Sequence, residues 1–284
     1  HSLNIPLIPI NHIQAHIFAN LLERNLEDIR FPVMCLTISG GHNELYYWKD
    51  LFDLERIAET RDDASGEAFD KVAKMMWLGY PGGPIISQYA AEHEANFPPY
   101  EGGIKGGLGE NNSLYKGIFP IVMLEKDSLD FSFSGLKSAV KREVDRRRMK
   151  NEELQMTNNC HPELVSGSHE IRGDAEINLP AGRQGSAWQV NYLTEDDKRE
   201  IAYEFEMTVV EILKRKLFMA QEKYSVDTVM LAGWVSCNNR LKATIREEAE
   251  KRGLKFFHPV SNLYSMDNAA MVGMLGYYKI LNNK

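Results

Sequence analysis

The chain has 284 residues, of which 43% are hydrophobic and 26% are charged, an ordinary balance for a globular protein with a sizeable core. No apolar run approaches the roughly eighteen residues of a membrane span, and nothing near His1 resembles a signal peptide. The net charge of -7 excludes steering onto nucleic acid by global charge, so such contact needs a local basic patch. The three cysteines lack C-x-x-C spacing and indicate reduced thiols in a cytoplasmic protein without membrane association.

The first elements are predicted from apolar periodicity and from turn residues. Residues 5–10 read as a short buried strand interrupted by prolines. Asn11 is a good N-cap, and apolar residues at helical spacing predict a helix over 12–28. Apolar segments at 31–38 and 44–48 flank two glycines, which predicts two strands joined as a hairpin.

The rest of the chain is predicted to alternate helices with strands, so the fold class is α/β. The expected helices are 63–78, 85–94, 134–149, 193–223, 239–252 and 268–281, and the expected strands are 118–124, 228–232 and 255–258. Residues 96–112 are rich in glycine and proline and are expected to form a loop. Residues 156–190 have no periodic pattern and are predicted to be a mobile, disordered insertion.

Two histidines stand four residues apart on the first predicted helix. This spacing points the imidazoles of His12 and His16 the same way, as two ligands of one metal ion require. A bare H-x-x-x-H pattern fits two surface or packing histidines equally well. A metalloprotease H-E-x-x-H motif would need glutamate at position 13, where the chain has Ile13, so that class is excluded.

Glycine-rich turns follow several apolar segments. Residues 39–42 (SGGH) come directly after a predicted strand, so backbone N–H groups there can approach a phosphate closely. Residues 82–83 form a second glycine pair, and Gly233 follows a third apolar strand, with Ser236 and Asn238 just beyond. Most such pairs are only turns, but three of them in an α/β chain favour a nucleotide site at strand ends.

Acidic residues gather at the start of the helix predicted over 63–78. Asp62 and Asp63 suit a helix N-terminus, and Asp63, Glu67 and Asp70 share one helical face. The carboxylate of Asp70 is placed to accept hydrogen bonds from ribose hydroxyls. The alternative is a solvated face that pairs with neighbouring lysines.

Asp267 precedes the last predicted helix, where it suits the N-cap position. The alternative is a role as third ligand beside His12 and His16. Two histidines and one carboxylate form a facial set that suits iron or another divalent ion with open positions.

The helix predicted over 134–149 concentrates positive charge on an acidic protein. Its basic residues, with one just beyond, are Lys137, Lys141, Arg142, Arg146, Arg147, Arg148 and Lys150. Such a run is usually a solvated face, but against the net charge it is the best candidate for contact with the phosphates of RNA.

Taken together, these stretches resemble the TsaD family, the catalytic subunit of tRNA threonylcarbamoyladenosine synthase, formerly called O-sialoglycoprotein endopeptidase. The matching residues, in family order along nearly the whole chain, are Asn11, His12 and His16, then 38–42 (ISGGH), 62–71 (DDASGEAFDK), 80–84 (YPGGP), 130–137 (DFSFSGLK), 235–238 (VSCN), and Asp267 with Asn268, Ala270 and Met271.

The resemblance implies an actin-like, sugar-kinase-type ATPase fold with two lobes and a nucleotide between them. It implies transfer of a threonylcarbamoyl group from threonylcarbamoyl-AMP to N6 of adenosine 37 in tRNAs that read codons beginning with A. The expected partners are tRNA and accessory subunits similar to TsaB and TsaE.

The resemblance also implies a set of site residues. His12, His16 and Asp267 would hold one metal ion, typically Fe²⁺, although another divalent metal is open. The residues expected to bind threonylcarbamoyl-AMP or ATP are Thr37, Ile38, Ser39, Gly40, Gly41, Asp70, Gly83 and Asn238. No side chain is assigned as a catalytic acid, base or nucleophile.

The chain departs from the family in three places. The family's first strand and its glycine–acid–threonine phosphate loop have no match, so residues 1–284 are expected to be a TsaD-type catalytic domain whose first lobe is truncated. Trp234 stands where the family has glycine, and it would crowd the nucleotide or adopt dihedral angles that only glycine favours. Residues 156–190 have no family counterpart.

Two other functions remain open. One is a small-molecule carbamoyltransferase or kinase-like ATPase of the same fold, against which residues 130–137 and the basic helix favour the tRNA enzyme. The other is an inactive paralogue subunit, which would be expected to lack the metal residues that this chain has.

Overall fold

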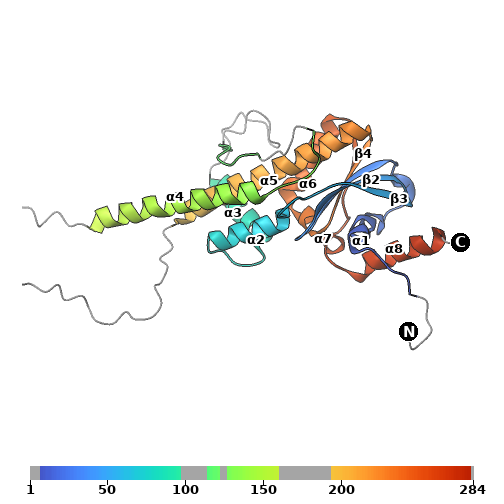
Figure 1. Ribbon diagram of the computed structural model, residues 1–284, viewed down its shortest axis with the longest axis horizontal. Helices are drawn as coiled ribbons and strands as arrows, with labels where there is room; N and C mark the ends of the chain where they lie inside the picture. The colour runs from blue at the N-terminus through green and yellow to red at the C-terminus, as the bar shows by residue number, and fades with distance from the viewer. Residues whose placement is uncertain (1–6, 97–113, 122–126, 160–192, 283–284) are drawn as a thin grey trace, which may run out of the picture.

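The computed structural model describes residues 7–96, 114–121, 127–159 and 193–282 (Figure 1). Residues 97–112 of the loop predicted over 96–112 and residues 160–190 of the predicted insertion lie outside these ranges, whereas Asn96 is the last residue of a helix. Of the strand predicted at 118–124, residues 118–121 have no regular structure and the rest lies outside. No helix in the described part of the chain is both long and apolar enough to cross a bilayer.

A five-stranded mixed sheet in the order β3-β2-β1-β4-β5 forms the centre of the molecule. The strands are β1 Val33–Ile38, β2 Asn43–Asp50, β3 Asp53–Glu59, β4 Thr228–Ala232 and β5 Lys255–Phe257. β2 pairs antiparallel with both β1 and β3, whereas β4 runs parallel to β1 and to β5. The α/β class and the predicted hairpin are therefore confirmed. β3 was not predicted, because its side chains are mostly exposed and give little apolar signal.

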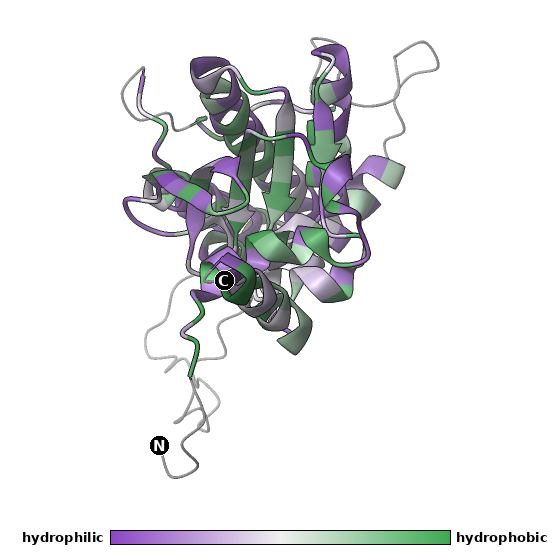
Figure 2. Ribbon diagram, turned by 90° about the vertical axis from the view of Figure 1, so that its right-hand side faces the viewer, coloured by the Kyte–Doolittle hydropathy of each residue, from purple (hydrophilic) through white to green (hydrophobic). Residues whose placement is uncertain are grey.

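Helices cover both faces of the sheet. They are α1 His12–Phe18, α2 Ser65–Met75, α3 Gly82–Asn96, α4 Ser134–Asn159, α5 Glu195–Tyr224, α6 Asn239–Lys251, α7 Asn262–Ser265 and α8 Ala269–Asn282, with 3-10 turns η1 Ala19–Leu21, η2 Leu26–Asp28 and η4 Trp234–Cys237. Figure 2 shows the hydrophobic strands enclosed by helices that carry hydrophilic residues on their outer faces.

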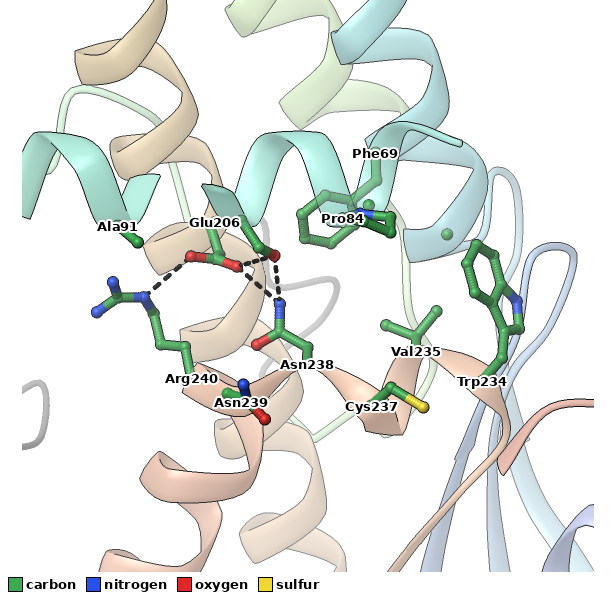
Figure 3. A pocket seen from close by; sticks show the side chains of 13 residues that line it. Phe69, Pro84, Ala91, Glu206, Trp234, Val235, Cys237, Asn238, Asn239 and Arg240 are labelled. Atoms are coloured by element: carbon green, nitrogen blue, oxygen red, sulfur yellow. Dashed lines mark hydrogen bonds and ion pairs between the residues drawn. The ribbon is translucent and has the colours of Figure 1, made fainter. Parts of the chain in front are cut away.

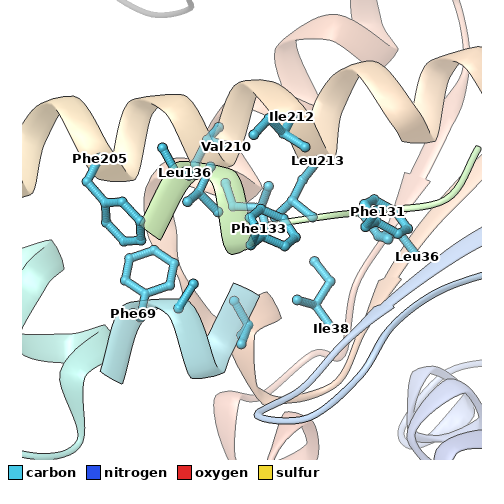
Figure 4. Packing of buried hydrophobic residues seen from close by; sticks show 14 of the residues in the cluster. Leu36, Ile38, Phe69, Phe131, Phe133, Leu136, Phe205, Val210, Ile212 and Leu213 are labelled. Atoms are coloured by element: carbon cyan, nitrogen blue, oxygen red, sulfur yellow. The ribbon is translucent and has the colours of Figure 1, made fainter. Parts of the chain in front are cut away.

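Alternate side chains of β1 divide the core into two clusters. Met34, Leu36 and Ile38 pack against the side formed by α2, α4, α5 and α6 (Figure 4). Val33 and Cys35 point to the opposite face, where they meet α1 and α8. Because successive residues of a strand point to opposite faces, a strand buried on both sides is mostly apolar, as β1 is apart from Thr37.

The N-terminal segment differs from the prediction. Residues 7–10 form no strand, and the side chain of Leu7 is 86% exposed. The N-cap is confirmed, since Asn11 Oδ1 accepts a hydrogen bond from the Gln14 N–H at 3.0 Å. The helix expected over 12–28 ends at Phe18, however, and continues as the separate turns η1 and η2.

Two long helices begin as predicted, but one of them runs further. The side chain of Thr194 caps α5 through a reciprocal capping box with Asp197. α4 continues to Asn159, ten residues past the predicted end at Met149, so residues 156–159 of the predicted insertion are helical.

Asp62 caps α4, although it was predicted to favour the N-terminus of the helix expected over 63–78. α2 begins only at Ser65, and the Asp62 carboxylate accepts hydrogen bonds from Ser132 Oγ at 2.5 Å, Phe133 N at 2.9 Å, and Ser134 Oγ at 2.7 Å. These groups form the start of α4. Burial by itself would raise the pKa of Asp62, but the hydrogen bonds outweigh it and hold the pKa below the ordinary 3.8.

We expect Asp62→Ala to lower the free energy of unfolding by about 1 kcal/mol at neutral pH, because the start of α4 loses its cap. A carboxylate with a lowered pKa stabilises the fold above its unfolded pKa and loses that contribution as pH falls through the folded value. Urea unfolding of both proteins should therefore show the difference at pH 7 and its loss as the pH falls through the lowered pKa of Asp62, below the ordinary 3.8. A difference that stays the same size across this range would contradict the cap.

Candidate functional site

His12, His16 and Asp267 meet although 251 residues separate the second histidine from the aspartate in the sequence. Asp267 Oδ1 lies 3.2 Å from His12 Nε2 and 3.1 Å from His16 Nε2. One ligand atom from each residue lies within 4.8 Å of the others, and no second such group occurs among the described residues. The predicted metal-ligand set is thus brought together in space.

The two histidines differ in environment. The His16 side chain is 2% exposed, whereas that of His12 is 55% exposed. Burial lowers the pKa of His16, as does the nearby His12, while Asp267 opposes the shift. Neutral imidazole is the form that binds metals, so burial prepares His16 as a ligand.

Asp267 does not serve as the N-cap of the last helix. Asn268 has that role, since its Oδ1 accepts a hydrogen bond from the Met271 N–H at 2.9 Å. The alternative in which Asp267 caps the last helix is therefore wrong, and its carboxylate faces the two histidines instead.

The donor set fits a divalent transition metal. Metal–ligand bonds of about 2.1 Å on one face of an octahedron place the ligand atoms roughly 3 Å apart. The separations of 3.1 and 3.2 Å between Asp267 Oδ1 and the two imidazole Nε2 atoms match that spacing, and all three ligand atoms lie within 4.8 Å of one another. Two imidazole nitrogens and one carboxylate oxygen would leave the remaining coordination positions open for a substrate.

The SGGH turn and the turn after β4 lie side by side at one edge of the sheet. β1 and β4 are parallel neighbours, so both end there. Gly233 adopts φ +82°, and a Cβ at this position would stand 2.3 Å from the Ile38 carbonyl oxygen. Only glycine permits this approach.

The start of α2 closes on the same turn. A Cβ on Gly66 would stand 2.7 Å from Ser39 O and 2.8 Å from Gly40 Cα. The Glu67 N–H also donates to Gly40 O at 3.0 Å. The helix start and the SGGH turn therefore touch backbone to backbone.

A cavity of about 370 Å³ opens beside these turns (Figure 3). It lies between α2, α3, α5 and the segment that joins η4 to α6. Its walls are formed by Gly66, Phe69, Gly83, Pro84, Ser87, Ala91, Glu206, Trp234, Val235, Cys237, Asn238, Asn239 and Arg240.

One end of the cavity is polar. Asn238 Nδ2 donates to Glu206 Oε1 at 2.7 Å and to Ser87 Oγ at 3.1 Å, and Arg240 Nε donates to Glu206 Oε2 at 3.0 Å. Glu206 is 2% exposed, so its charge is compensated by these donors. Sequence reasoning missed Ser87, Glu206 and Arg240. Glu206 and Arg240 lie in different helices, and no local sequence pattern marks two such residues as partners.

The predicted nucleotide residues are only partly gathered here. Gly83 and Asn238 line the cavity, whereas Thr37 and Ile38 are buried within the sheet. The SGGH turn, with Ser39, Gly40 and Gly41, borders the cavity through its contact with Gly66. Asp70 Oδ1 accepts a hydrogen bond from the Gly82 N–H at 2.7 Å, so it caps the start of α3.

Trp234 fills space between the cavity and the SGGH turn. Its indole Nε1 would lie 3.6 Å from a Cβ on Gly40. Among the described residues, the non-glycine positive φ angles are at Glu23, Trp77 and Ser225, so Trp234 avoids the conformation that glycine favours. Of the two effects expected of Trp234, unfavourable dihedral angles are therefore excluded, and crowding of the nucleotide remains.

The cavity and the histidine cluster are connected. Ser236 of η4 bonds through Oγ to Ser265 Oγ at 3.2 Å, two residues before Asp267. On the histidine side, Asn20 Nδ2 donates to the Leu231 carbonyl of β4 at 3.0 Å. Both sites are thus held by the same strand end.

A mixed α/β sheet, glycine turns at two strand ends, a cavity beside them and a His–His–Asp cluster define an α/β protein with a candidate metal centre and a ligand pocket, both linked to the end of β4. A model of the TsaD family, tRNA N6-adenosine threonylcarbamoyltransferase, matches residues 1–274. The chain belongs to this family.

Curated relatives carry the same name. The tRNA N6-adenosine threonylcarbamoyltransferase of Clostridioides difficile is 36% identical over 284 residues, which is 100% of this chain and 65% of the relative. Those of Staphylococcus carnosus and Staphylococcus epidermidis are 37% and 38% identical over 96% of this chain and 60% and 61% of their own lengths. The chain therefore spans less than two thirds of the length of these relatives.

Among solved structures, the crystal structure of T. kodakarensis HypF aligns with a TM-score of 0.41 and 14% identity, covering 98% of this chain and 38% of that one. A likeness this low supports no inference.

We expect Gly66→Ala to lower the melting temperature by several degrees, because the new methyl group meets backbone atoms of Ser39 and Gly40 that have no room to move. Gly83→Ala is the matched control, since a Cβ there has nothing within 4 Å. Scanning calorimetry of the two variants checks the contact. Equal melting temperatures would show that α2 does not close on the SGGH turn.

Proposed function

We propose that the protein transfers the threonylcarbamoyl group of threonylcarbamoyl-AMP to N6 of adenosine 37 in tRNAs that read codons beginning with A. The observation that carries this proposal is the assembly of His12, His16 and Asp267 in a chain of the threonylcarbamoyltransferase family. Family membership does not favour the small-molecule carbamoyltransferase, the kinase-like ATPase or the inactive subunit.

In the reaction, N6 of the adenosine attacks the carbonyl carbon of the mixed anhydride, the bond from that carbon to the phosphate oxygen breaks, AMP leaves, and the proton lost from N6 passes to solvent. A bound metal, which we propose is Fe²⁺, would supply Lewis acidity to the carbonyl and phosphate oxygens. His12, His16 and Asp267 would hold that metal.

The pocket residues would bind and orient the adenylate. The polar end of the pocket, with Ser87, Asn238 and Glu206, would face the nucleoside. The backbone N–H groups of Gly40 and Gly41 would approach the phosphate, whereas the Ser39 N–H donates to the His42 carbonyl at 2.8 Å. Asp70 would reach the ribose only through the carboxylate oxygen that does not cap α3.

The remaining parts of this proposal rest on the family resemblance. They are an actin-like fold of two lobes, a catalytic domain spanning residues 1–284 with an insertion after α4, a requirement for TsaB- and TsaE-like subunits, and a cytoplasmic location. The mixed sheet and its helices on both faces are compatible with one lobe of such a fold.

The test is reconstitution. The protein is incubated with tRNA, threonine, bicarbonate, ATP, Fe²⁺ and the partner enzymes, and the modified nucleoside is measured by mass spectrometry. We expect product with the wild-type protein, and loss of at least a hundredfold in rate with His12→Ala or Asp267→Asn, together with loss of bound metal.

His258→Ala is the control for the reconstitution, because this histidine lies outside the cluster and should leave metal content unchanged. Full activity of His12→Ala, or no product from the wild-type protein, would overturn the proposal.

Trp234→Gly should tighten binding of AMP about tenfold, because removal of the indole opens the space between the cavity and Gly40. Trp234→Phe, which keeps a ring, should bind AMP much like the wild-type protein. Isothermal titration measures both dissociation constants. An unchanged constant for Trp234→Gly would show that this side chain does not restrict the nucleotide.

A further inference from the structure

The turn between α2 and α3 exposes two large aromatic side chains near the cavity. Trp77 is 55% exposed and Tyr80 is 83% exposed. The segment that carries them leads directly into Gly83 and Pro84, which line the cavity. Large exposed rings on a segment that leads into a pocket wall favour a binding surface.

The backbone at Trp77 supports the same conclusion. Trp77 adopts φ +60°, the left-handed conformation in which glycine normally ends a helix. The closing bonds of α2, from Trp77 N to Lys74 O and from Leu78 N to Ala73 O, involve backbone atoms only. A glycine would close the helix without strain, so the turn itself does not explain the indole.

Basic side chains lie on α4, the helix that packs against α2. α4 runs beside α2 in the same direction, since Lys137 pairs with Asp63 before α2 and Arg148 donates to the Met75 carbonyl at its end. Lys141 lies between these two contacts on α4, next to Arg142, and Lys74 lies on the last turn of α2. In the described part of the chain these three cations are exposed and form no ion pair with a described residue.

We propose that this surface, made of Lys74, Trp77, Tyr80, Lys141 and Arg142, binds the single-stranded loop of the RNA substrate. Lysine and arginine pair with phosphates, and exposed rings stack on bases that are free of a duplex. A loop held here would present an unstacked base at the rim of the cavity. The inference rests on the proposed function, because it assigns the substrate surface beside that site.

The experiment compares two labelled RNAs, an anticodon stem–loop and a blunt duplex of the same stem, by fluorescence anisotropy over a range of salt concentrations. Trp77→Gly and Tyr80→Ala should each weaken stem–loop binding at least fivefold and leave duplex binding unchanged, because only the loop has bases to stack. Trp77→Gly suits the backbone conformation, so loss of folding would not account for its effect.

The charge variant Lys141→Gln/Arg142→Gln should weaken stem–loop binding and reduce the slope of log K against log salt by about 1.4, the value for two lost phosphate contacts on a single strand. The matched controls are Phe52→Ala, an exposed ring on the β2–β3 turn, and Lys223→Gln/Lys255→Gln, two exposed lysines elsewhere. Both controls should bind like the wild-type protein.

Unchanged stem–loop binding in both aromatic variants would overturn the inference, as would weakening of equal size in the controls. AMP binding by the aromatic and charge variants should stay unchanged, because these variants leave the cavity residues intact. AMP binding therefore distinguishes a failure of this inference from a failure of the proposed function. Loss of RNA binding with normal product from an excess of tRNA supports the surface. If the wild-type protein binds the loop through Trp77 but forms no product, the proposed reaction is contradicted and the RNA-binding surface is not.

Discussion

The contact between the Ile38 carbonyl and Gly233 determines the geometry of the whole site. β1 and β4 are parallel neighbours, and at this point their ends approach so closely that no side chain fits on residue 233. The chain therefore turns sharply after both strands, which places the SGGH turn beside η4. Gly66 then packs on that turn, so the cavity wall is built from backbone where a ligand needs close approach.

The same strand end joins two faces of the sheet that the core keeps apart. The cavity lies with α2, α3 and α5, whereas the histidines belong to α1 on the opposite face. Asn20 fixes the α1 side to β4, and the hydroxyl contact between Ser236 and Ser265 fixes the Asp267 side to η4. Because polar contacts of this kind need both partners in place, local unfolding of η4 would disturb the cavity and the metal cluster together.

Local sequence signals predicted the parts of the fold that depend on neighbours in the chain. The N-caps Asn11 and Thr194, the fully buried strands β1 and β4, and most of α5 followed from period and cap chemistry. The cap at Asp62, the start of α2 and the polar end of the cavity depend on partners more than twenty residues away. No single-sequence pattern encodes such distances, so these features required the structure.

The basic helix shows why a count of charges is a poor guide to a binding face. Arg147 is buried and pairs with Glu143, Asp197 and Glu200, which ties α4 to α5. Those charges serve the fold, because a buried guanidinium without partners would be strongly destabilising. Helical spacing separates them from the exposed Lys141 and Arg142 on the other side. The face available to a phosphate backbone is therefore set by the register of α4 against its neighbours, and not by its net charge.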